Sequence, residues 1–193
     1  MSYCSARWIS DYGFNNALRY RLFDEGPAAV AAAVSSVESL LLWGGIGADS
    51  VPYLEPTFVI EAPATLPDSA GAYRLTGRSD SRVELFSLAF AMPETADGDG
   101  SSAFAFVLPV RPGWEGNLAS ITLTGPGGSF TLDGDSDLSV AILRNPRNGQ
   151  VRGILRDLPG PAQAAMDSAT VQAGPGLEVL FSRGIPDAAV WNR

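Results

Sequence analysis

The chain has 193 residues, of which 46% are apolar, and this is enough material for one domain with a packed core plus an additional segment. Its formal net charge of -8 argues against binding to nucleic acid or to an anionic membrane, because both need clustered basic side chains. The chain contains no histidine, which excludes a Ser-His-Asp triad and a zinc site made of three histidines. The single cysteine, Cys4, has no partner within the chain, so the fold does not depend on an internal disulfide.

Residues 1–26 are predicted to form a turn followed by a short helix. Ser10 is a good N-cap, Asp11 suits the positively polarised first turn, and Gly26-Pro27 ends the helix. Apolar residues recur on one helical face at Phe14, Ala17, Leu18 and Leu22. The alternative for the same residues is an ordinary amphipathic helix that follows a short coil. No basic region followed by an apolar run is present, so we expect no signal peptide in this chain.

Residues 27–36 are rich in alanine and are expected to form a linker, although a short helix fits this composition equally well. From about residue 37 the chain changes to short apolar segments separated by Gly, Pro, Asp and Ser, a pattern typical of antiparallel β-structure. The sequence therefore predicts three parts, which are residues 1–26, a linker at 27–36 and a β domain at 37–193.

Alternation of large and small side chains is clearest in the middle of the β domain. Large residues share one face of each of two segments, 83–92 and 103–108, which are expected to supply the centre of the core. These large residues are Phe86, Leu88, Phe90 and Met92 in the first segment and Phe104, Phe106 and Leu108 in the second. The other predicted strands are 39–46, 57–62, 72–76, 121–124, 129–132, 138–143, 151–155 and 177–182.

Asn148-Gly149 predicts a hairpin between strands 138–143 and 151–155, because this dipeptide readily adopts positive φ angles. About nine or ten strands, with no helix expected among them, predict a mainly β fold. The architecture we expect is an antiparallel two-layer sandwich of immunoglobulin-like or fibronectin-like type, preceded by the short N-terminal helix. The order of the strands is not readable from the sequence.

Met1-Ser2-Tyr3, with the segment 7–12 and the predicted helix after it, resembles the Met-turn region of bacterial secreted metzincin zinc endopeptidases that carry a C-terminal β domain. In that family a zinc-binding helix with histidine ligands precedes the turn. The resemblance implies that Met1 lies beneath a catalytic zinc ion. It also implies that the Tyr3 hydroxyl reaches the zinc or the oxyanion of the tetrahedral intermediate, where it donates a hydrogen bond to developing negative charge.

The same resemblance implies that the chain is the C-terminal fragment of a secreted zinc-dependent metalloendopeptidase whose substrate is a protein. Residues 1–26 would be the end of its catalytic domain, and residues 37–193 a non-catalytic β-sandwich domain. Zinc would be held only in the full-length enzyme, by an N-terminal catalytic segment of the same polypeptide. Without histidine the chain alone is expected to be inactive. We expect Met1 to be an internal methionine of a longer reading frame, and a protease remnant is the alternative.

A self-contained β-sandwich binding or adhesion module is the alternative function, with a glycan or a protein surface as partner. Trp114, in the Pro- and Gly-rich segment 112–116, is the candidate for stacking on a sugar, because this segment is the most loop-like of those that carry tryptophan. The competing interpretation places it in the core, where tryptophan is more often found.

Two segments with alternating aspartates suggest a calcium site, because hard cations bind clustered carboxylate oxygens. The aspartates are Asp97 and Asp99 in the first segment and Asp133, Asp135 and Asp137 in the second. An EF-hand loop does not fit, since Leu138 and Arg144 stand where that loop needs Gly and Glu. Calcium held between sandwich loops is one interpretation, and solvated hairpin ends are the other.

Overall fold

The chain divides into two compact units, Met1–Ser35 and Ser36–Arg193. The predicted N-terminal helix and most of the predicted linker lie outside the residues that the structure describes. In this computed structural model the described residues are 36–92, 100–134, 136–147, 149–186 and 191, all within the second unit.

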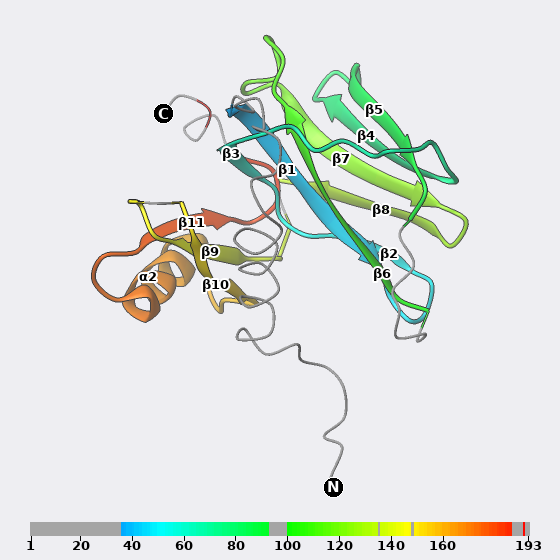
Figure 1. The fold of residues 1–193 in the computed structure, drawn as a ribbon. Coiled ribbons are helices and arrows are strands. Elements are labelled where there is room, and N and C mark those ends of the chain that lie inside the picture. Colours follow the sequence, from blue (N-terminus) through cyan, green and yellow to red (C-terminus); the bar gives the residue numbers. More distant parts are fainter. Residues whose placement is uncertain (1–35, 93–99, 135, 148, 187–190, 192–193) are drawn as a thin grey trace, which may run out of the picture. The chain divides into compact units, whose positions relative to one another are not determined.

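The second unit is mainly β, with antiparallel sheets and one helix in its described part, which confirms the predicted fold class (Figure 1). Every strand predicted from the sequence overlaps a strand of the structure. The strands are β1 (Val37–Ile46), β2 (Pro52–Leu54), β3 (Phe58–Ala62), β4 (Tyr73–Ser79), β5 (Glu84–Phe90), β6 (Ser102–Pro109), β7 (Leu118–Gly125), β8 (Gly128–Asp133), β9 (Val140–Arg144), β10 (Val151–Arg156) and β11 (Glu178–Ser182), and the helix is α2 (Ala162–Ala173).

The first sheet is organised around β1. On one edge β1 pairs with β6 along residues 39–46. On its other edge it pairs with β3 through residues 37–41 and with β2 through residues 44–46. The second sheet has the strand order β5-β4-β7-β8, and every pairing in both sheets is antiparallel.

The largest core cluster contains residues of these first two sheets. Leu40 and Leu42 of β1 are fully buried, and Phe90 of β5 is fully buried with its ring centroid 5.0 Å from those of both Phe104 and Phe106. Burying each such side chain contributes about 1.5–3 kcal/mol. The large-small alternation read from the sequence therefore placed the centre of the core correctly.

A third sheet, with the order β10-β9-β11, contributes to a second cluster together with residues of the first sheet. Val140 and Ile142 of β9 are buried there with Phe58 of β3, and Leu41 and Trp43 of β1 pack against them. Because Leu40 and Leu42 belong to the main core, β1 is covered on both faces. This explains its unbroken apolar run, which is typical of strands buried on two sides.

Helix α2 packs with the opposite face of the third sheet, where Ala141 of β9 meets Ala165 and Ala169. This helix corrects the expectation of no helix in the β domain. Pro161 precedes its first turn, and Gly174, with a φ of 68°, ends it. The third sheet and α2 are thus added to the predicted two-layer sandwich.

The predicted hairpin is confirmed between β9 and β10, which pair antiparallel. The Asn145 N–H donates to the Gln150 carbonyl at 2.9 Å, and the Gly149 N–H donates to the Asn145 carbonyl at 2.9 Å. Gly149 has a φ of 69°, the left-handed conformation that glycine adopts without strain.

Candidate functional site

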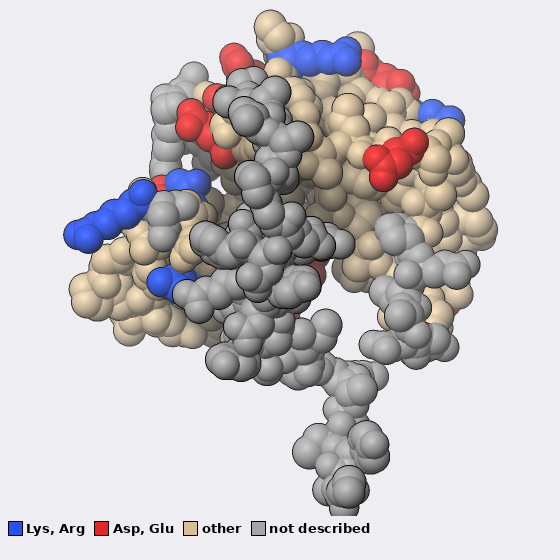
Figure 2. Space-filling view, viewed as in Figure 1, with Lys and Arg blue, Asp and Glu red and all other residues tan. Residues whose placement is uncertain are grey.

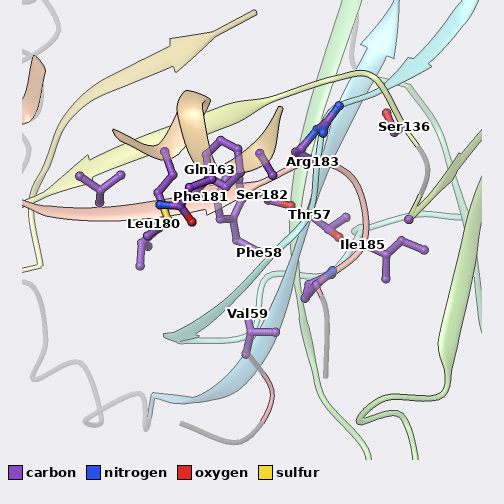
Figure 3. A pocket seen from close by; sticks show the side chains of 15 residues that line it. Thr57, Phe58, Val59, Ser136, Gln163, Leu180, Phe181, Ser182, Arg183 and Ile185 are labelled. Carbon is purple, nitrogen blue, oxygen red and sulfur yellow. The ribbon is translucent and has the colours of Figure 1, made fainter. Parts of the chain in front are cut away.

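A cavity of about 580 Å³ lies between β3, β11 and the first turns of α2 (Figure 3). Its volume falls in the range of about 300–1,000 Å³ that is typical of ligand pockets. Apolar side chains form much of its wall, among them Phe58, Met166, Leu180 and Phe181. Figure 3 shows Phe58 and Phe181 facing the middle of the cavity and Arg183 at the end where β11 runs into the following loop.

Thr57 and Gly184 join β3 to β11 at this end of the cavity. The Thr57 N–H donates to the Gly184 carbonyl at 2.7 Å, and the Thr57 hydroxyl donates to the same oxygen at 2.9 Å. Residue 184 has to be glycine, because a Cβ there would overlap the carbonyl oxygen of Asp133. The joint therefore fixes where β11 ends and holds Arg183 beside the cavity.

Arg183 is the one charged residue among the described residues that line the cavity. Its Nε is buried and has no hydrogen-bond partner within the described part of the chain. Its Nη2 lies 4.0 Å from Oδ1 of Asp137, whose side chain is fully exposed. So long a contact with a solvated carboxylate contributes little, and the described residues bring no nearer counter-charge to this partly exposed side chain. An unpaired buried donor is unfavourable, so this end of the cavity favours a ligand that carries an acceptor.

A second polar cluster connects the first and third sheets. Arg156 of β10 donates from Nε to Oε1 of Glu55 at 3.0 Å, and its guanidinium carbon lies 5.2 Å from the ring centroid of Trp43. Trp43 Nε1 donates to the Pro56 carbonyl at 2.7 Å. Burial raises the pKa of the Tyr53 hydroxyl, and the charge of Glu55 raises it further. These contacts hold two sheets together.

Most of the site residues predicted from the sequence lie outside the described residues. These are Met1, Tyr3, Asp97, Asp99 and Asp135. Asp133 ends β8, and Asp137 lies in the connection to β9 near Arg183. Among the residues that the structure describes, no three His, Cys, Asp or Glu side chains are grouped closely enough to hold a metal ion. Because Asp135 is outside them, calcium binding stays a prediction.

Trp114 lies in the core, as the competing interpretation placed it. It is only 4% exposed, and its ring centroid lies 5.0 Å from that of Phe86 in the main core. Gly113 and Gly116, with φ angles of 91° and 67°, lie on either side of Trp114 in a tight turn. This turn directs the Trp114 side chain into the core. A ring enclosed in this way offers no face for a sugar.

Charged side chains are interspersed on the face shown in Figure 2, and no continuous basic patch forms there among the described residues. No described helix combines the length and the hydropathy that crossing a bilayer requires. No protein-family model, curated protein or solved structure matches the chain.

Sequence reasoning did not find Arg183 or the aromatic residues around it. The strands of Phe58 and Phe181 were predicted, but their local patterns do not reveal which neighbours their outer edges meet. The segment Ser182-Arg183-Gly184 holds the one available signal, a cation directly followed by a glycine at a strand end.

Proposed function

We propose that residues 36–193 are a non-catalytic binding module and that the cavity between β3, β11 and α2 is its ligand site. The observation that carries this proposal is the combination of a cavity of about 580 Å³ with one cation at its end, Arg183, to which the described residues bring no counter-charge nearer than 4.0 Å. Apolar walls supply the free energy of binding, and a single polar anchor fixes the orientation of the ligand. The ligand class this favours is an apolar molecule with an anionic group.

The experiment uses the full 193-residue chain and the dye 8-anilinonaphthalene-1-sulfonate, which combines apolar rings with one sulfonate. We expect its fluorescence to rise saturably with protein concentration. Gln163→Trp places a large ring at an exposed position that lines the cavity and should reduce this binding at least about tenfold. Gln172→Trp is the matched control, because Gln172 is exposed on the same helix and does not line the cavity.

Equal dye binding by the two tryptophan variants would contradict the proposal. Circular dichroism and thermal unfolding of both variants check that each has kept the fold, so that lost binding is not mistaken for lost structure.

A second function follows from the resemblance of residues 1–26 to the Met-turn region of metzincins. We infer that the chain is the C-terminal part of a secreted zinc endopeptidase, in which residues 36–193 form the accessory module. In support of this, the units divide at Ser35 and Ser36, next to the boundary predicted between the linker and the β domain. Zinc and the protein substrate would then belong to a catalytic segment of the same polypeptide, with Met1 and Tyr3 at its end.

The genomic DNA upstream of the codon for Met1 tests this second function. An in-frame His-Glu-x-x-His-x-x-Gly-x-x-His would support it, and Tyr3→Phe in the longer protein should then reduce peptide hydrolysis. A stop codon followed by a ribosome-binding site would contradict it and would leave the binding module as the function of the chain.

A further inference from the structure

The cavity lies along the edge of β11 and not over one of its faces. Five consecutive residues, 179–183, line it. Their side chains alternate between the two faces of the strand. Val179 and Phe181 pack with the cluster of Ala165 and Ala169 on the helix side, whereas Leu180 packs with the cluster of Phe58 on the other side. A cavity over one face would be lined by every second residue, since neighbouring side chains of a strand point to opposite faces. Main-chain groups of β11 therefore border the cavity.

The strand edges that border the cavity are open within the described part of the chain. There β11 pairs with β9 alone, and β3 pairs with β1 alone. The two strands meet at the hydrogen bonds between Thr57 and Gly184, where β3 begins and β11 ends. Beyond this joint, alternate N–H and C=O groups of an unpaired edge have no strand to bond, and such an edge is a template for an added strand.

The charge at the cavity is opposite to that of the whole chain. The chain carries 21 acidic and 13 basic residues, yet among the described residues the cavity is lined by Arg183 and by no Asp or Glu. A guanidinium matches a carboxylate geometrically, because its planar N–H groups can bond both oxygens. An anionic group is therefore favoured at the end of β11.

We propose that the ligand of this cavity is a short extended peptide, which pairs with the open edge of β11 and places a carboxylate on Arg183. This inference rests on the proposed binding function and names its ligand class. A peptide supplies the main-chain donors and acceptors as well as the carboxylate. Its side chains on one face of the added strand contact Phe181 and Met166, and those on the other face contact Phe58. Five residues of β11 extend over about 17 Å, so a segment of about five residues is sufficient.

The first experiment selects peptides from a random hexapeptide library with free C-termini on the immobilised 193-residue chain. Gln163→Trp serves for counter-selection, and Gln172→Trp is again the control. We expect enriched peptides that carry apolar residues on both faces of the added strand, and these should displace the dye. N-methylation of the alternate amides that face β11 should weaken binding about tenfold or more, whereas methylation of the other set should have a smaller effect.

The second experiment tests the carboxylate. Wild-type protein should bind the enriched peptides about tenfold or more tightly than their C-terminal amides. Arg183→Gln should remove this preference while thermal stability stays close to wild type, because Arg183 is partly exposed and makes only one long ionic contact. Arg183→Lys should restore part of the preference. A preference that persists in Arg183→Gln would overturn the assignment of Arg183.

Dodecanoate distinguishes failure of this inference from failure of the proposed function. Suppose that no hexapeptide binds the wild-type chain better than the Gln163→Trp variant, while dodecanoate displaces the dye. The peptide inference is then wrong and the cavity remains a ligand site. If both N-methylated series bind equally, strand pairing is wrong. If dye, dodecanoate and peptides all fail to distinguish Gln163→Trp from Gln172→Trp, both proposals are wrong.

Discussion

The core between the first two sheets and the packing around the third sheet use different side chains. The first is built from large residues such as Phe90, Phe104 and Phe106, whose rings contact one another. Around the third sheet, Ala141, Ala165 and Ala169 let α2 approach closely, and a cavity lies beside them. In the first core the interlocking side chains leave no room for a ligand, whereas beside the third sheet a cavity lies along the edge of β11. The first core therefore stabilises the unit, whereas the surroundings of the third sheet are suited to binding.

Phe90→Ala has the largest effect that we expect, because it empties the centre of the first core. Phe90 is fully buried, and its ring contacts three other aromatic rings. The loss in free energy of unfolding should be about 3–5 kcal/mol, measured by urea denaturation. Phe181→Ala, at the partly buried edge of the cavity, is the comparison variant and should cost less. Equal losses would mean that the two regions do not differ in packing.

Ala165→Leu tests the close approach of α2. Ala165 is fully buried against the third sheet, so three extra carbon atoms have no space and should cost about 1–3 kcal/mol of unfolding free energy. Ala164→Leu is the matched control, because the neighbouring side chain is exposed and leucine is a good helix former. Thermal unfolding of both variants measures the difference. An unchanged melting temperature for Ala165→Leu would show that the helix is not held in close contact.

Glu178→Gln removes the ion pair between β9 and β11, in which Arg144 Nη2 lies 2.7 Å from Glu178 Oε2. Both side chains are partly exposed, so solvent screening limits the expected loss to about 0.2–1 kcal/mol. A double-mutant cycle with Arg144→Gln measures the coupling, which should decrease further in high salt. Coupling that is large and insensitive to salt would place this pair in a much drier setting.

The smallest effect concerns Tyr53. Its pKa in the folded protein is raised, first by burial and then by Glu55, above the ordinary value of 10.0. The stabilisation of its neutral form is therefore fully present below pH 10 and is lost as the pH rises through the folded pKa. Absorbance titration at 295 nm, taken as the difference from Tyr53→Phe, follows this ionisation. Arg156→Gln should raise the pKa further, because the charge of Arg156 lowers it.

Much of the fold was predictable because large and small side chains alternate along individual strands. The segments 83–92 and 103–108 show a period of two, and the structure places their large side chains in one core. Strand order was not predictable, since nothing near β1 in the sequence indicates that it pairs with β6. The short strand β2 was missed because it has only three residues and begins with a proline, which cannot donate to a ladder.

Helix α2 and the cavity were missed for related reasons. The buried positions of α2 are alanines, so the segment shows no large apolar stripe, and only the flanking Pro161 and Gly174 signal a helix. Arg183 is one of the 13 basic residues, and its sequence neighbours do not reveal that its strand edge stays open. The resemblance to metzincins concerns residues before Ser36, so the described structure leaves it as a proposal.

The position of β1 has a consequence for synthesis of the protein. It is the first strand of the described unit to leave the ribosome, yet its partners β6 and β9 are made much later. Until they emerge, the run Leu40-Leu41-Leu42-Trp43 lacks its ladder partner on one edge and part of the core that covers it. Chains that stop before β6 should therefore associate through this strand, and the module should require nearly its whole length before it folds.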